Sequence, residues 1–260
     1  MSIRSKILAG AATLALVSGA ALAGSASAAT PSCGNSNDCL NIFSHKFGTY
    51  HHPNFVLDVF QAGAAVGKPI ILYRTSNSDP AEDFTVSDQG TVSDFYAAGL
   101  VSSTVALHYG CTPGTTIAGP GGPIACSATS VDETAFEIEY SPYGVGSGLC
   151  VGLASTAAQG GRVTLQPCGD SSKTVWVWDT YDQDLFQTFV NGFTFPAING
   201  SDTNFSHPYV LDYPHNADPN DKPRAQLQVN RLTGFSNGSG PIVGAVIDTQ
   251  LWGGRFGVLP

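Results

Sequence analysis

The chain has 260 residues, a formal net charge of −9 at pH 7 and only 12% charged residues. Nucleic acids and anionic membrane surfaces are bound by clustered Lys and Arg, so we expect no nucleic acid and no membrane among the partners. Abundant Gly, Pro, Ser, Thr and Asn, without a sustained helical period of apolar residues, predict an all-β protein rich in turns.

Residues 1–28 have the composition of a secretory signal peptide. Arg4 and Lys6 precede the apolar stretch ILAGAATLALVSGAALAG, and Ala26-Ser27-Ala28 forms an A-x-A cleavage site. The apolar stretch is short and rich in small residues, which is atypical of a transmembrane helix. We therefore expect a secreted, extracellular chain that begins at residue 29.

Six cysteines in an exported chain indicate three disulfides. The spacing favours pairs of neighbours along the chain: Cys33 with Cys39, Cys111 with Cys126, and Cys150 with Cys168. Metal binding is the alternative, but no C-x-x-C pair or histidine at ligand spacing accompanies them. The first pair closes a small loop in residues 29–50, which we interpret as an extra N-terminal arm.

A strand followed by a hairpin occurs three times. The copies FVLDV (55–59), LCVGL (149–153) and YVLDY (209–213) are each followed by a polar loop and a second apolar strand. Gly152 stands in the second copy where the other two have Asp58 and Asp212. The loops are matched in length, because the separations from these positions to Leu72, Leu165 and Leu227 agree within two residues. We therefore predict three copies of one structural unit.

One aromatic residue follows each hairpin on a short strand. These residues are Phe84 in EDFTV, Trp176 in TVWVW and Trp252 in TQLWGG. The third unit carries an insertion of Gly, Ser and Asn character ahead of its aromatic residue. A large ring in each unit supplies the apolar area that a shared threefold core needs.

These features resemble the ricin-B-type β-trefoil lectin family. The resemblance is carried by the V-x-D-type strands, by one intact Q-x-W motif at Gln250-Leu251-Trp252, and by the Cys150 and Cys168 pair. It covers residues 50–84 and 149–252. It implies a β-trefoil, in which three four-strand units surround a pseudo-threefold axis as a six-stranded barrel capped by three hairpins.

The resemblance divides the chain into a trefoil over residues 51–260 and the arm that precedes it. Repeat one is predicted at 51–84, repeat two at 149–180 and repeat three at 205–256. Residues 85–148 are longer than the usual link between two repeats, so they are predicted to be an insert. Its segments TVALHYG and AFEIEY alternate in polarity and predict extra strands beside the Cys111–Cys126 loop.

The resemblance also implies where a sugar would bind. An aspartate at this strand end accepts hydrogen bonds from sugar hydroxyls, and an aromatic residue of the second strand stacks on the sugar ring. Asp58 and Tyr73 take these places in repeat one, although Ala81, Glu82 and Asp83 stand where the family has Asn-Gln. In repeat three the predicted carbohydrate-binding residues are Asp212, Gln226 and Gln228, with Tyr213 as the available ring.

Simpler interpretations apply to the same residues. The aspartates can cap the turns that follow them, and Tyr73 can be a half-buried strand residue without a ligand. Repeat two, with Gly152 and Gln166, is expected to bind nothing.

Two other groups of acidic residues are candidates for catalysis or metal binding. Glu137 and Glu139 lie on one face of a predicted strand. They are interpreted either as the paired carboxylates of a glycoside hydrolase or as part of a solvated strand face. The loop YPHNADPNDKP gathers Asp212, His215, Asp218 and Asp221, but it lacks the turn glycine and the alternation of an EF-hand. We interpret it as an acidic turn and expect no metal and no cofactor.

The leading functional hypothesis is a secreted carbohydrate-binding protein without catalysis, with a glycan or polysaccharide as partner. The alternative is a trefoil that binds a secreted protein through its disulfide-closed loops, as a protease inhibitor or an adaptor. A cryptic glycoside hydrolase is the third hypothesis. The fold separates none of these, because function depends on the site.

Overall fold

The structure is a computed structural model. It describes residues 39–49, 52–76, 79–109, 111–117, 124–126, 134–169, 173–179, 187–192, 208–214, 217–220, 224–233 and 246–256. The predicted signal peptide and Cys33 lie outside the described residues. No helix in this part of the chain is long and apolar enough to cross a membrane.

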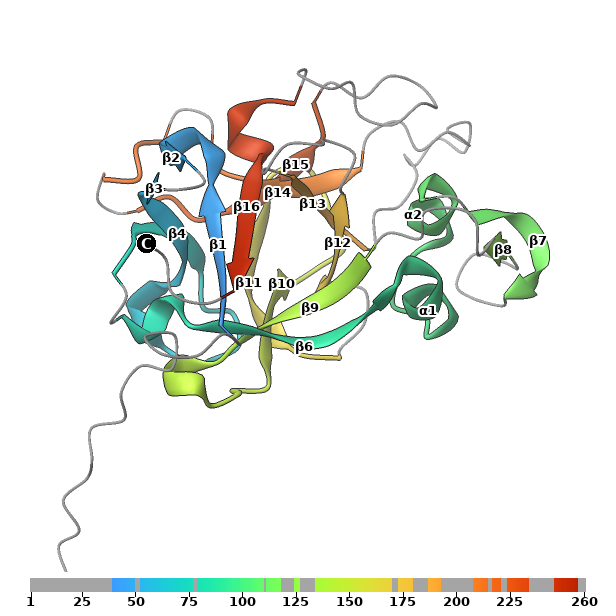
Figure 1. The fold of residues 1–260 in the computed structure, drawn as a ribbon, viewed down its shortest axis with the longest axis horizontal. Helices are drawn as coiled ribbons and strands as arrows, with labels where there is room; N and C mark the ends of the chain where they lie inside the picture. Colours follow the sequence, from blue (N-terminus) through green and yellow to red (C-terminus); the bar gives the residue numbers. More distant parts are fainter. Residues whose placement is uncertain are drawn as a thin grey trace, which may run out of the picture.

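Twelve of the sixteen described strands form three successive sets of four (Figure 1), and β2 (Gly48–Thr49) and β3 (His52–Pro53) form a small separate pair within the first repeat. The first set is β1 (Leu40–Ser44), β4 (Phe55–Val59), β5 (Ile70–Arg74) and β6 (Phe84–Thr91). The second is β9 (Thr134–Tyr140), β10 (Leu149–Leu153), β11 (Gly161–Pro167) and β12 (Val175–Asp179). The third is β13 (Thr188–Asn191), β14 (Tyr209–Asp212), β15 (Gln228–Arg231) and β16 (Trp252–Phe256).

Equivalent strands of the three sets pair in equivalent ways. The first and last strands meet across repeat boundaries as the antiparallel pairs β1–β16, β6–β9 and β12–β13. The middle strands form the hairpins β4–β5, β10–β11 and β14–β15. The hairpins are joined by β11–β15 pairing and by bridges from Pro69 to Thr164 and from Ile71 to Gln226. The fold is therefore an all-β trefoil, as predicted.

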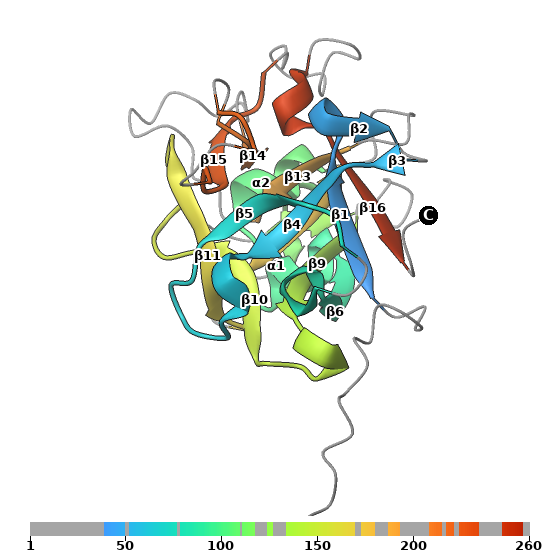
Figure 2. The ribbon, with the colours of Figure 1, turned by 90° about the vertical axis from the view of Figure 1, so that its left-hand side faces the viewer.

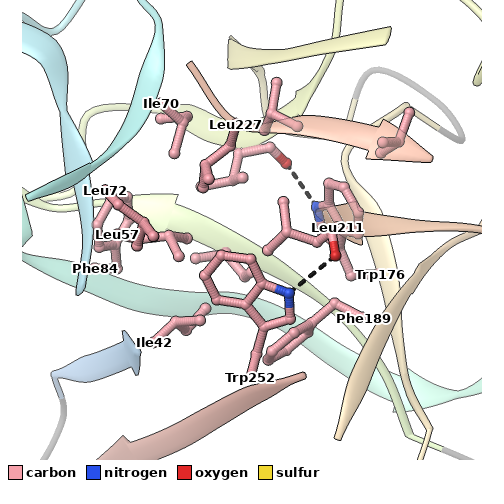
Figure 3. Packing of buried hydrophobic residues seen from close by; sticks show 14 of the residues in the cluster. Ile42, Leu57, Ile70, Leu72, Phe84, Trp176, Phe189, Leu211, Leu227 and Trp252 are labelled. Atoms are coloured by element: carbon pink, nitrogen blue, oxygen red, sulfur yellow. Dashed lines mark hydrogen bonds between the residues drawn. The ribbon is translucent and has the colours of Figure 1, made fainter. Parts of the chain in front are cut away.

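The core lies on the pseudo-threefold axis, where each repeat contributes one large ring. Phe84, Trp176 and Trp252 are all buried in the same apolar cluster. Figure 3 shows the two indoles donating hydrogen bonds to main-chain carbonyls: Trp176 Nε1 to Val151 O at 2.9 Å, and Trp252 Nε1 to Leu211 O at 2.9 Å. Phe84 has no donor, so repeat one lacks this bond.

The N-terminal boundary of the trefoil differs from the prediction. All five residues of β1 are buried, and the strand pairs with both β16 and β4. The barrel therefore begins at Leu40, inside the segment predicted as an arm. β1 packs closely on the last strand, because a Cβ added to Gly253 would lie 2.2 Å from the Phe43 ring.

The insert is also shorter than predicted. β6 and β9 pair from Phe84 opposite Tyr140 to Thr91 opposite Thr134, so both are barrel strands. What lies between them is α1 (Val92–Ala97), α2 (Ser103–His108) and the pair β7 (Cys111–Ile117) and β8 (Ile124–Cys126). The segment TVALHYG falls largely in α2 and not in a strand, because the Ser102 side chain accepts a hydrogen bond from Val105 N and caps a helix.

The insert packs on one side of the barrel. Its helices contribute Val92, Phe95, Tyr96 and Val105 to a second apolar cluster that includes residues of β12 and β13. Figure 1 shows α1, α2 and the β7–β8 pair on the side away from the β4–β5 hairpin, and Figure 2 shows α1 and α2 behind that hairpin. The described part of the insert therefore leaves the first hairpin uncovered.

The predicted disulfide between Cys150 and Cys168 is present, with an S–S distance of 2.04 Å. Cys39 and Cys111 are also disulfide-bonded. Cys126, whose side chain is outside the described residues, lies opposite Cys111 in the β7–β8 register. The cysteine spacing therefore identified one complete pair, and the other two pairings stay predictions.

Candidate functional site

Three equivalent positions on β4, β10 and β14 are the candidate sites. They are Asp58, Gly152 and Asp212, which directly follow the buried core residues Leu57, Val151 and Leu211. Both aspartates are only 4% exposed. Their surroundings differ enough that each repeat is described separately.

In repeat two the backbone of a neighbouring segment fills the position. A Cβ added to Gly152 would lie 2.7 Å from the carbonyl oxygen of Lys173 and 2.8 Å from Cγ2 of Thr174. Gln166 is engaged locally, because its Nε2 donates to Thr164 Oγ1 at 2.8 Å. The chain therefore has no room for a ligand-binding aspartate here.

Replacing Gly152 by alanine is expected to lower the free energy of unfolding by about 1–3 kcal/mol, the usual range for overpacking. The added methyl group would press on backbone atoms, which cannot rotate away. Urea unfolding followed by circular dichroism measures the change. Gly90→Ala is the control, because a Cβ there meets its nearest atoms at an ordinary 3.4 Å. Equal stabilities of the two variants would contradict the close packing at Gly152.

In repeat three the acid is held by two amides. Asp212 Oδ2 accepts hydrogen bonds from Asn230 Nδ2 at 2.8 Å and from Gln250 Nε2 at 3.2 Å. Gln250 is itself fixed, since its Oε1 accepts from Thr233 N and its Nε2 also donates to Arg231 O. The other carboxylate oxygen, Oδ1, is buried and has no partner among the described residues.

The residues predicted to bind a sugar together with Asp212 are placed differently from one another. Gln226 donates to Val163 O at 2.8 Å, so it joins two hairpins. Gln228 lies opposite Asp212 in the β14–β15 register, and its role in binding stays a prediction. Tyr213 is wrong as a stacking ring, because it is fully buried and packs edge-on against Phe47 with ring centroids 5.4 Å apart.

In repeat one Asp58 lines a pocket of about 450 Å³. The half-buried Tyr73 lines it too, and the guanidinium carbon of Arg224 lies 4.0 Å from the centroid of its ring. Arg224 comes from repeat three, so the pocket joins two repeats. The described residues that line it are Asp58, Phe60, Gln61, Ala62, Ile71, Tyr73, Asp79, Ala81 and Arg224. Asp58 and Tyr73 therefore line the same pocket, with Arg224 covering one face of the ring, and their role in binding stays a prediction.

Two further acids stand beside Asp58. One carboxylate oxygen from each of Asp58, Asp79 and Glu82 lies within 4.8 Å of the others. Glu82 precedes Phe84 by two positions, as Gln250 precedes Trp252, so it occupies the glutamine position of a degenerate Q-x-W motif. Its two carboxylate oxygens accept from Ser76 N at 2.9 and 3.0 Å.

Burial changes the acidity of this cluster. It raises the pKa of Asp58 from 3.8 to about 7, the negative charge of Asp79 adds to the rise, and Arg224 partly offsets it. Burial likewise raises the pKa of Glu82 from 4.5 to about 8, against hydrogen bonds from Ser76 and Thr75 that favour the charged form. The cause is the cost of holding several like charges in a poorly solvated place.

No protein-family model matches the chain, and no curated protein matches it. Among solved structures it is similar to a designed threefold symmetric protein, ThreeFoil, with 13% identity over 84% of this chain and 97% of that chain, and a TM-score of 0.47. It is also similar to a mosquitocidal holotoxin, with 12% identity over 85% of this chain and a TM-score of 0.42. This chain spans 17% of the holotoxin.

Glu137 and Glu139, for which a solvated strand face and a hydrolase pair are the two interpretations, have structural partners. Glu137 is buried and accepts hydrogen bonds from Gly169 N and from Thr174 Oγ1, so it is not on a solvated face. Glu139 accepts from Gly148 N at 2.7 Å. Each carboxylate thus fixes a neighbouring loop.

The acidic turn after β14 is only partly described. Asp218 accepts from Asn220 N at 2.8 Å within the turn, while His215 and Asp221 lie outside the described residues. Among the described residues, the structure places a cluster of three carboxylates in repeat one.

Proposed function

We propose that the protein is a secreted carbohydrate-binding protein that holds a glycan in the repeat-one pocket and does not catalyse its turnover. One observation carries the proposal: Asp58 is a buried acid that lines a pocket and receives no hydrogen bond from the described residues. Secretion rests on the composition of residues 1–28.

The groups around this pocket suit a polyhydroxylated ligand. An ionised Asp58 accepts hydrogen bonds from two neighbouring hydroxyls, and such charge-assisted bonds are strong. The guanidinium of Arg224 offers donors to ring and hydroxyl oxygens, while Tyr73 adds apolar area. Together they provide an acceptor, donors and a ring within one pocket.

We propose Asp212 as a second, smaller site. Asn230 and Gln250 hold one oxygen of its carboxylate, while the other oxygen, Oδ1, is buried and has no hydrogen-bond partner among the described residues. Two sites on one chain raise the effective concentration for a polymeric glycan, so weak single-site affinities combine into useful binding.

The Asp58→Asn variant is expected to bind the preferred glycan about 10–100-fold more weakly, since charge-assisted hydrogen bonds contribute about 1.5–3 kcal/mol. A glycan array identifies the ligand, and titration calorimetry then compares Asp58→Asn, Asp212→Asn and the wild type. Asp88→Asn removes an equal charge from an exposed position of β6 and serves as the control. Unchanged affinity in the Asp58→Asn, Asp212→Asn double variant would sink the proposal.

A further inference from the structure

The charge of the three acids of repeat one, Asp58, Asp79 and Glu82, is only partly offset within the described residues, by Arg224 acting on Asp58. Their closest oxygens lie within 4.8 Å of one another. No Lys, Arg or His of the described residues forms an ion pair with any of them. Arg224 influences Asp58 through space but stacks on Tyr73 and donates to Pro219 O. Within the described part of the chain, the carboxylates of the cluster therefore have no cation paired with them.

The carboxylates are positioned by the chain and still have free acceptor capacity. Asp79 Oδ1 accepts from Ala81 N at 3.0 Å and caps the short helix Pro80–Glu82. Glu82 is held by Ser76 N and, at 3.4 Å, by Thr75 Oγ1. Asp58, 4% exposed, faces the pocket without a hydrogen-bond donor. A buried acceptor of this kind needs a partner that the described protein groups do not supply.

Repeat three shows what is different about repeat one. There, Gln250 donates an amide N–H to Asp212. In repeat one Glu82 stands at the equivalent position and, when ionised, has no hydrogen to donate. The substitution exchanges a donor for a second acceptor, so a ligand that carries positive charge is favoured beside Asp58 and Glu82.

We propose that Asp58, Asp79 and Glu82 bind a divalent cation, with calcium as the preferred ion. Two oxygens bound to one Ca²⁺ at about 2.3–2.6 Å can lie up to about 4.6–5.2 Å apart, which fits the spacing of the cluster. Mg²⁺ bonds of about 2.0–2.1 Å require all oxygens within about 4.2 Å and near-octahedral order. An all-oxygen ligand set is the one that these hard cations prefer.

Oxygen atoms in the pocket would complete the coordination of the cation. Three carboxylates supply at most six oxygens, and Ca²⁺ takes about 6–8, so water or ligand oxygens fill the remaining positions. The site does not depend on the proposed glycan function, because its three ligands all belong to the chain.

Differential scanning fluorimetry of the purified full chain, treated with EDTA and then dialysed, tests the site without any sugar. Addition of CaCl₂ at pH 8 is expected to raise Tm by about 5–10 °C once Ca²⁺ is about 100-fold above its dissociation constant. MgCl₂ and NaCl at matched ionic strength are expected to give smaller shifts.

Glu82→Gln and Asp79→Asn each remove one ligand and are expected to lose most of the calcium shift. Glu82→Gln also restores the amide found at Gln250, so it is suited to the fold. Asp88→Asn, an exposed acid of β6, is expected to keep the shift. The inference is overturned by a wild type without a calcium shift or by equal shifts in all variants. Because no glycan is present, failure here and failure of the glycan proposal are separate results.

Discussion

Replacement of Trp252 by alanine is expected to lower the free energy of unfolding by about 3–5 kcal/mol, the range for large-to-small changes of buried aromatic residues. The indole is fully buried in the core on the threefold axis. Its removal leaves a cavity and also leaves the Leu211 carbonyl without the donor that Trp252 supplies at 2.9 Å.

Trp252→Phe separates the two contributions. It keeps an aromatic ring, as Phe84 does at the equivalent place in repeat one, but loses the N–H donor. We expect a smaller loss of about 1–3 kcal/mol, the cost of an unsatisfied buried carbonyl. Urea unfolding followed by circular dichroism measures both variants, with Val145→Ala as a control because Val145 is 69% exposed. A loss below about 1 kcal/mol for Trp252→Ala would show that this ring is not central to the core.

Local sequence was sufficient to predict the hairpins and the aromatic residues. Each hairpin joins strands that are neighbours along the chain, so its pattern is visible in a short window. The first strand of each repeat has no such pattern. β1 was assigned to an arm, β9 to an insert, and β13 to the stretch between repeats two and three. These strands are defined by partners far away in sequence, such as β16 for β1.

The candidate site was predicted only where it copies a repeated motif. Asp58, Tyr73 and Asp212 follow from the resemblance, and Asp58 and Tyr73 line one pocket. Arg224 was missed because repeat three folds back beside repeat one. Glu82 was noted as a departure from Asn-Gln, but its closeness to Asp58 and Asp79 depends on tertiary structure. Gln250 was recognised as a fold motif, and its hydrogen bond to Asp212 was not anticipated.

Stability without divalent cations is expected to fall as pH rises from about 4 to about 8 because of the repeat-one acids. Burial raises the pKa of Asp58 from 3.8 to about 7, so the unfolded chain ionises first and the folded chain keeps its proton. Between these values the unfolded state binds fewer protons, and the free energy of unfolding therefore decreases with pH. At about 1.4 kcal/mol per pKa unit, the loss from Asp58 alone is on the order of 4 kcal/mol.

Urea unfolding in EDTA at pH 4, 6 and 8 measures this loss, and neutral variants isolate it from other titrating groups. Asp58→Asn and Glu82→Gln are each expected to gain stability relative to the wild type as pH rises, with most of the gain between pH 5 and pH 8. Their effects are not expected to be additive, because the charge of Asp58 raises the pKa of Glu82. If the free energies of unfolding of the wild type and the variants change in parallel with pH, these carboxylates are well solvated. If the stability difference between the wild type and the neutral variants widens with pH in EDTA and disappears when calcium is added, the bound ion offsets the cost of the buried charges.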